Sequence, residues 1–219
     1  MTVEQTIDDC REVTIGTAPQ LKALLGIPQN ARGLVIFAHG SGSGRLSPRN
    51  NYVAHELRGA GFATLLVDLL TPEEERDRRN VFDIALLASR LNMAADWAEH
   101  RRELAGLAPA YFGSSTGAGA ALQAAAGDPR IAAIVSRGGR PDLAGGSALA
   151  HVTAPTLLIV GALDGAVVGL NEAAATAMNC EHTMAIVPGA GHLFEEPGAL
   201  RQVVDLAIDW FRQHPGVAA

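Results

Sequence analysis

Hydrophobic positions along the chain fall into two alternating patterns. Short runs that are apolar at almost every position, as expected of strands buried on both faces, cover residues 33–38, 62–67, 131–135, 156–160 and 183–187. Between and after them, residues 82–104 and 198–214 repeat apolar side chains every three or four positions, which is the helical spacing. Strands that alternate with helices predict an α/β fold, a doubly wound and mostly parallel sheet with helices on both faces.

Further segments complete the predicted order of elements. Residues 12–17 and 21–27 predict an antiparallel hairpin, and residues 48–61 predict a helix that begins with proline and ends at glycine. Residues 71–80 are heavily charged and predict an exposed loop. Because no repeat or linker interrupts the pattern, residues 1–219 are expected to form a single domain.

One five-residue run carries a nucleophile motif. Residues Gly113 to Gly117 read G-S-S-T-G, between a strand-like stretch at 110–112 and an alanine-rich, helix-favouring stretch at 118–126. A G-x-S-x-G run in this setting is typical of a nucleophile elbow, a strained turn from strand to helix that exposes the central serine, here Ser115. Glycines flank the serine because strand and helix approach too closely for side chains at those positions.

Three other predicted strands end in residues that suit a serine nucleophile. The run at 33–38 leads into His39-Gly40-Ser41 and a glycine-rich turn that can present backbone N–H groups. Asp164 and His192 each follow one of the last two apolar runs. Nucleophile, acid and histidine therefore occur in the order Ser, Asp, His, each at the carboxyl end of a strand.

In these features the chain resembles the α/β-hydrolase superfamily. Within it, the chain looks most like the small, capless dienelactone-hydrolase-like group of serine hydrolases and esterases. The resemblance spans about Gly33 to Phe211 and rests on His39-Gly40, residues 113–117, Asp164 and Gly191-His192. It implies an α/β-hydrolase fold without a cap domain. Dienelactone hydrolase itself has a cysteine nucleophile, whereas this elbow carries Ser115, which favours general ester chemistry.

The predicted roles follow from what a serine nucleophile needs. A serine hydroxyl requires an adjacent base to take its proton, and His192 is placed for that role. Asp164 is the preferred acid to orient His192, and Asp142, after the preceding strand, is the alternative. The backbone N–H groups of Ser41 and Thr116 are expected to form the oxyanion hole.

Two arginines beyond the strand at 131–135 leave two interpretations open. Arg137 and Arg140 either bind a carboxylate on the substrate or are solvated or salt-bridged parts of their loop. The loop leaves the sheet beside the elbow, at the edge where ligands bind in open α/β sheets. Substrate binding is therefore a hypothesis for both residues.

Bulk composition narrows the class of partner. A formal net charge of −6 argues against nucleic acid and anionic membranes. No run approaches the length of a membrane span, and residues 1–4 lack signal-peptide features, so a cytoplasmic location is expected. Cys10 and Cys180 lie far apart, and either free thiols or a bridge between them fits the sequence. No metal-ligand spacing occurs, so neither a metal nor a cofactor is expected.

These features together predict a metal-free serine hydrolase that cleaves short-chain carboxylic esters or lactones through an acyl-enzyme on Ser115. The connection at 136–155 is too short for a cap domain, so an open site for a small-molecule ester is expected. A thioesterase, amidase or acyltransferase with the same triad is one alternative, and a catalytically silent ligand-binding domain is the other. The protein is expected to act as a monomer or homodimer.

Overall fold

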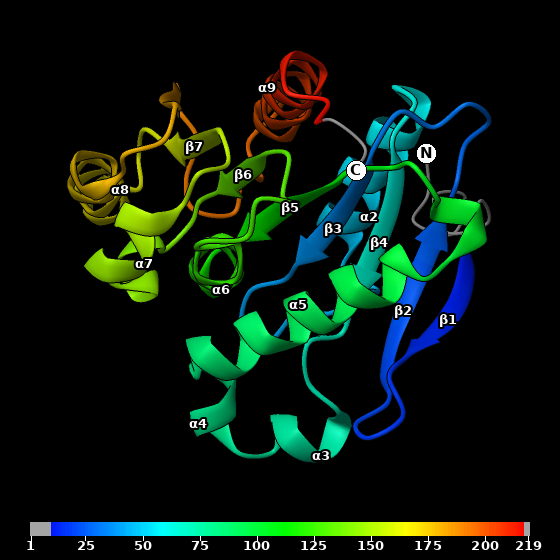
Figure 1. Ribbon diagram of the computed structural model, residues 1–219. Helices are drawn as coiled ribbons and strands as arrows, with labels where there is room; N and C mark the ends of the chain where they lie inside the picture. The colour runs from blue at the N-terminus through cyan, green and yellow to red at the C-terminus, as the bar shows by residue number, and fades with distance from the viewer. Residues whose placement is uncertain (1–9, 217–219) are drawn as a thin grey trace.

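Eight strands form one sheet in residues 10–216, the part of the chain that this computed structural model describes (Figure 1). In spatial order they are β1 (Arg11–Ile15), β2 (Leu21–Gly26), β4 (Ala63–Val67), β3 (Leu34–Ala38), β5 (Pro109–Ser114), β6 (Ile134–Arg137), β7 (Thr156–Gly161) and β8 (His182–Val187). The β1–β2 and β2–β4 pairs are antiparallel, and every later pair in this order is parallel. The predicted hairpin and the mostly parallel sheet are thus confirmed.

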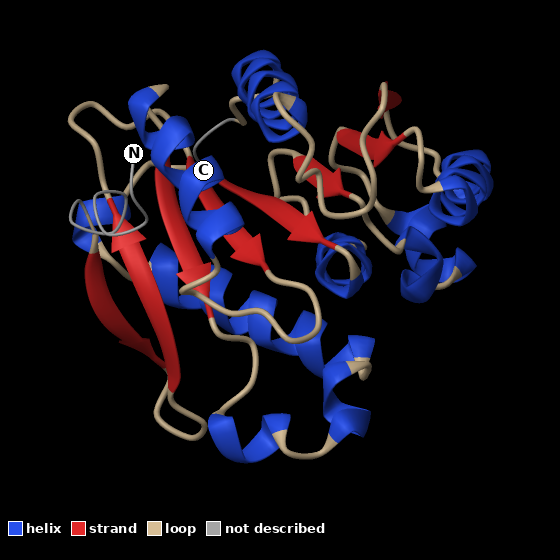
Figure 2. Ribbon diagram, turned by 180° about the vertical axis from the view of Figure 1, so that it is seen from behind, coloured by secondary structure: helices blue, strands red, loops and turns tan. Residues whose placement is uncertain are grey.

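Helices cover both faces of the sheet, as Figures 1 and 2 show from opposite sides. One face packs against α5 (Ile84–Glu99), α6 (Thr116–Ala125), α7 (Gly146–His151) and α8 (Gly165–Ala177). The other packs against α2 (Pro48–Gly59) and α9 (Ala199–Gln213), which also contact each other. β3, β4 and β7 are buried at every position because helices lie on both sides of them, which explains their unbroken apolar runs. The doubly wound α/β fold is confirmed, and no cap domain interrupts the described residues.

Two predicted boundaries were displaced. The strand predicted at 131–135 begins only at Ile134, although Ile131 and Ala133 are buried as well. The helix predicted at 82–104 ends at Glu99 and is followed by a separate 3₁₀ turn, Arg102–Leu104. Burial extends past the hydrogen-bonded element in both cases, so an apolar pattern alone overestimates its extent.

The prediction of an exposed loop at 71–80 was wrong. This segment forms two short helices, α3 (Pro72–Glu75) and α4 (Arg78–Val81). The first begins with a capping box, in which the Thr71 hydroxyl accepts from the Glu74 N–H at 3.2 Å and the Glu74 carboxylate accepts from the Thr71 N–H at 2.8 Å. Local capping therefore outweighs the high charge of the segment.

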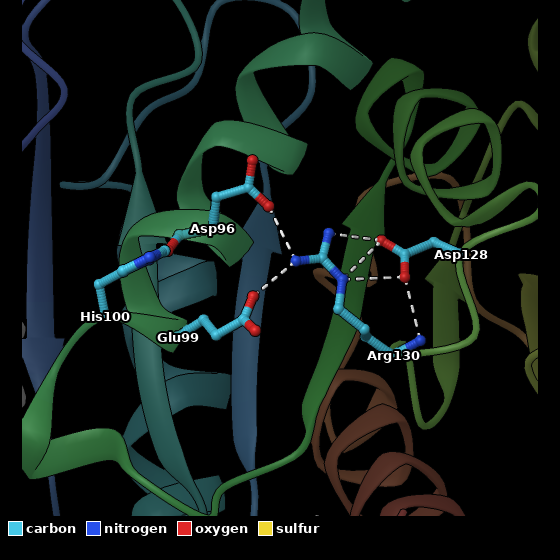
Figure 3. A network of polar contacts seen from close by, with 5 residues as sticks. All are labelled: Asp96, Glu99, His100, Asp128 and Arg130. Atoms are coloured by element: carbon cyan, nitrogen blue, oxygen red, sulfur yellow. Dashed lines mark hydrogen bonds and ion pairs between the residues drawn. The ribbon is translucent and has the colours of Figure 1, made fainter. Parts of the chain in front are cut away.

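A network of four charged residues links α5 to the loop that precedes β6 (Figure 3). The Arg130 guanidinium donates to Asp96 and Glu99 on α5 and to Asp128 in its own loop, at 2.8 Å in each case. The three carboxylates raise the pKa of Arg130, so its charge is permanent. The network fixes the amino-terminal edge of β6, and thereby the strand that ends beside the elbow.

Three further expectations from the sequence concern the two cysteines, membrane-spanning helices and the amino-terminal residues. No disulfide joins Cys10 and Cys180, so the bridge that the sequence left open is not formed. Within residues 10–216, no helix combines the length and apolar character needed to cross a bilayer. The expectation drawn from residues 1–4, that the chain starts without a signal peptide, lies outside the described residues.

Candidate active site

The elbow serine sits in a conformation that non-glycine residues rarely adopt. Ser115 joins β5 to α6 with φ 50° and ψ −123°. A Cβ on Gly113 would lie 2.5 Å from Ala118 Cα, and one on Gly117 would lie 2.2 Å from the Ala38 carbonyl oxygen. Both positions therefore require glycine, and the close packing on both sides of Ser115 maintains its strained backbone.

The loop after β3 packs directly on the elbow. A Cβ on Gly40 would lie 3.0 Å from the Cβ of Ser115, so the loop backbone is in contact with Ser115. His39 is buried and braces this loop, because its Nε2 accepts from the Leu69 N–H at 3.1 Å and its Nδ1 lies 3.0 Å from the Gly40 carbonyl. That pattern puts the ring proton on Nδ1, and both ring nitrogens make hydrogen bonds that support the loop.

Asp164 and His192 are brought together from the ends of β7 and β8. Asp164 Oδ2 lies 2.6 Å from His192 Nδ1, and the His192 side chain is 38% exposed. The alternative acid, Asp142, instead receives two hydrogen bonds of 2.8 Å from the Arg140 guanidinium. The structure therefore pairs the histidine with the later of the two candidate carboxylates.

Ser115 and His192 line the same cavity, which measures about 860 Å³. No hydrogen bond joins their side chains within the described residues; such contacts are often long in unliganded hydrolases and shorten when substrate binds. The cavity is also bordered by residues that the sequence did not point to: Arg45, Arg49, Leu70, Pro72, Glu75, Val81 and Leu87. Several of them come from the α3–α4 segment, which the sequence predicted as a loop.

The two expected oxyanion-hole residues face the cavity together. Thr116 is the first residue of α6, so its backbone N–H has no partner within the helix. The Ser41 N–H, however, donates to the Thr116 hydroxyl oxygen at 3.1 Å. The two residues are adjacent, but one of the two expected donors is already engaged by a side chain.

Arg137 and Arg140 have different surroundings. Arg137 ends β6 opposite Ser114, borders the cavity and is only 8% exposed. Burial, and secondarily the charge of Arg49, lowers its pKa to about 10, so Arg137 remains a cation at neutral pH. Its guanidinium lies 5.9 Å from the Phe112 ring, and its Nη1 is buried with no hydrogen-bond partner. Arg140 does not border the cavity and is paired with Asp142.

A supporting residue of the histidine loop was missed by sequence reasoning. The Glu196 carboxylate accepts from the Gly191 N–H at 3.0 Å, which fixes the backbone immediately before His192. Phe194, two residues beyond the histidine, is buried with a φ of 54°. Only a carboxylate five residues after a glycine marks this contact in the sequence, and that spacing has no general meaning. Among residues 10–216, no three His, Cys, Asp or Glu side chains are grouped as metal ligands would be.

The strand order and the strained serine between β5 and α6 define the class as an α/β hydrolase. No family model matches the chain. A solved dienelactone hydrolase from Anabaena variabilis is 54% identical to it, with a TM-score of 0.90 over 94% of this chain and 99% of that one. The chain belongs to the dienelactone hydrolase family of α/β hydrolases.

More distant solved structures share the fold alone. Est1E from Butyrivibrio proteoclasticus is 16% identical, with a TM-score of 0.79 over 93% of this chain and 98% of its own. An alpha-beta serine hydrolase homologue from Coxiella burnetii is 20% identical, with a TM-score of 0.75 over 91% and 96%.

Curated relatives carry a different name. Proteins from two Mycobacterium tuberculosis strains are 58% identical over 209 residues and bear the provisional name phosphoribosyl transferase. The match covers 94% of this chain but only 46% of theirs, so the chain spans less than half the length of these relatives.

Proposed function

We propose that this protein is a serine hydrolase that cleaves carboxylic esters through an acyl-enzyme on Ser115. The observation that carries the proposal is the 2.6 Å contact between Asp164 and His192 at the cavity that also contains the strained serine. In this reaction His192 takes the hydroxyl proton as the Ser115 oxygen attacks the ester carbonyl carbon, and Asp164 stabilises the resulting imidazolium.

The second half of the reaction returns the enzyme to its starting state. When the tetrahedral intermediate collapses, His192 gives its proton to the departing alcohol and the acyl group stays on Ser115. Water then attacks the acyl carbon while His192 takes a proton from it, and the proton returns to Ser115 as the carboxylic acid leaves. Thioester or amide cleavage would follow the same steps, and so would acyl transfer to another alcohol.

We assign the specificity for a charged substrate to Arg137. A buried guanidinium with an unpaired nitrogen has a strong preference for an anion, because burial has removed its water without supplying a counter-charge. Arg140 lacks this preference because Asp142 already neutralises it. The favoured substrate is therefore an ester that carries a carboxylate within reach of Arg137.

Covalent labelling tests the proposal. A fluorophosphonate should form one adduct on the wild-type protein, and Ser115→Ala should abolish it without changing the melting temperature. Ser114→Ala is the matched control, since Ser114 is 4% exposed and lies within β5, and it should leave labelling intact. A folded wild type that takes no label would instead favour the silent ligand-binding domain.

The competing candidate is the phosphoribosyl transfer named for the Mycobacterium tuberculosis relatives. That name belongs to proteins of which this chain matches 46%, whereas the dienelactone hydrolase is matched over 99% of its length. A phosphoribosyl transferase would consume a phosphoribosyl diphosphate whether or not residue 115 is serine. Equal consumption by the wild type and Ser115→Ala would support the transferase over the esterase.

A further inference from the structure

The hydroxyl of Thr116 stands between the loop after β3 and the nucleophile elbow. Its oxygen accepts the Ser41 N–H at 3.1 Å, and both residues border the cavity at Ser115. The loop lies directly on the elbow, because a Cβ on Gly40 would be only 3.0 Å from the Ser115 Cβ. The contact between Ser41 and Thr116 is therefore part of a tightly packed wall of the site.

This contact changes how the oxyanion hole can work. The hydroxyl oxygen and the backbone nitrogen of Thr116 belong to one residue, so covalent geometry keeps them within about 4 Å of each other. Thr116 borders the cavity, so a substrate oxygen on the hydroxyl side of the Thr116 N–H is within reach of both groups. The Ser41 N–H points at that same hydroxyl, so it has no free direction toward the substrate oxygen while the contact persists.

A hydroxyl that accepts one hydrogen bond still has a proton to donate. In the described residues the Thr116 side chain has the Ser41 N–H as a donor, and no carbonyl or carboxylate accepts from it. Accepting a hydrogen bond polarises the O–H group and makes it a better donor. The group is thus oriented and polarised before any substrate arrives.

We propose that the Thr116 hydroxyl is itself a donor of the oxyanion hole. It donates to the carbonyl oxygen as negative charge develops there, while it continues to accept from Ser41. Its own proton stays on the hydroxyl throughout. Ser41 then acts on the oxyanion through Thr116, and the Thr116 backbone N–H acts directly. The inference rests on the proposed ester hydrolysis at Ser115.

Two substitutions separate this role from simple packing. Thr116→Val keeps the shape but removes the hydroxyl, whereas Thr116→Ser keeps the hydroxyl and removes a methyl group. With p-nitrophenyl butyrate, Thr116→Val should lower kcat about 10²-fold with little change in KM, because a lost oxyanion donor acts only in the transition state. Thr116→Ser should stay within about tenfold of the wild type, and melting temperatures report on folding.

A transition-state analogue provides the second measurement. A trifluoromethyl ketone forms a tetrahedral adduct with the serine, so its inhibition constant should rise in Thr116→Val by about the factor lost in kcat. Thr116→Ala should give the same losses if the valine variant folds poorly. Unchanged kcat and inhibition constant in folded Thr116→Val, or Ala, would overturn the inference, as would a loss confined to KM. A wild type without Ser115-dependent hydrolysis would overturn the proposed function first, and the inference with it.

Discussion

Replacing Arg137 by methionine is expected to stabilise the protein and at the same time to weaken its binding of anionic esters. Arg137 is 8% exposed, and its guanidinium makes no hydrogen bond or ion pair with residues 10–216. A charge buried in this way destabilises the folded state, because water solvates it in the unfolded chain. Methionine fills similar space without a charge.

The expected gain in folding stability can be calculated from the pKa of Arg137. Burial, and secondarily the charge of Arg49, lowers the pKa of Arg137 well below the ordinary value of an arginine, to about 10. At about 1.4 kcal/mol per pKa unit, the charged side chain costs the folded state about 3 kcal/mol. Its contact with the Phe112 ring, at 5.9 Å, returns about 1 kcal/mol. The net gain for Arg137→Met is about 2 kcal/mol, or about 4–8 °C in melting temperature for a chain of this size.

Two measurements check the expectation. Calorimetry gives the change in melting temperature, and Arg140→Met is the matched control, since that arginine is paired with Asp142 and its loss should not stabilise the protein. Kinetics then compare p-nitrophenyl butyrate with mono-p-nitrophenyl succinate, which has the same acyl length and a terminal carboxylate. Arg137→Met should raise KM for the succinate ester and spare the butyrate ester, because only the first presents an anion.

The pH dependence has a definite sign. The folded-state pKa of Arg137 lies below its unfolded value, so the cost of the charge is complete below about pH 10 and declines as pH rises above about 10 toward the ordinary pKa of an arginine. The advantage of Arg137→Met should therefore be largest near neutral pH and shrink above pH 10. A melting temperature lowered by several degrees at neutral pH would refute the reasoning, since it would show that the charge supports the fold. An equal rise in KM for both esters in Arg137→Met would refute the anion-binding role of Arg137.

Three further predictions concern the rest of the site. Asp164→Asn should lower kcat by up to about 10⁴-fold in the p-nitrophenyl butyrate assay and Asp142→Asn far less, and the reverse ranking would move the acid to Asp142. Gly117→Ala should prevent normal folding or abolish fluorophosphonate labelling, because its Cβ would lie 2.2 Å from the Ala38 carbonyl oxygen; a stable, labelled variant would contradict the elbow geometry. Acetyl to butyryl esters should be hydrolysed faster than palmitoyl esters and without sensitivity to EDTA, whereas a preference for long chains or inhibition by the chelator would count against an open, metal-free site.

The sequence predicted the sheet well because buried parallel strands have a simple signature. β3, β4 and β7 are apolar throughout since helices cover both of their faces. The α3–α4 segment was missed because its charges were given more weight than the Thr71–Glu74 capping box, which the sequence contains. Because of that error, the sequence did not indicate that the α3–α4 segment forms one wall of the cavity.

The helix α8 was missed for a reason connected with function. Asp164 occupies its N-cap position, where an aspartate normally accepts a hydrogen bond from the first helical turn. Here its side chain makes no cap hydrogen bond and instead contacts His192 at 2.6 Å. The helix begins with glycine and has no charged residue in its first turn. The residue that should have signalled the helix serves the candidate site instead, and local rules often fail at such positions.

The two arginines of the β6 loop show what the sequence could have resolved. Within residues 10–216, an arginine stands two residues from an aspartate at three places, at Asp77 and Arg79, Asp128 and Arg130, and Arg140 and Asp142, and each pair forms a bidentate or multiple contact. Arg137 has only Val, Ser and Gly within two positions on either side. In this structure the nearby Asp142 neutralises Arg140, so Arg140 is the weaker candidate for binding an anion. That Arg137 is buried beside the candidate nucleophile depends on the register of β6 against β5, which only the folded sheet defines.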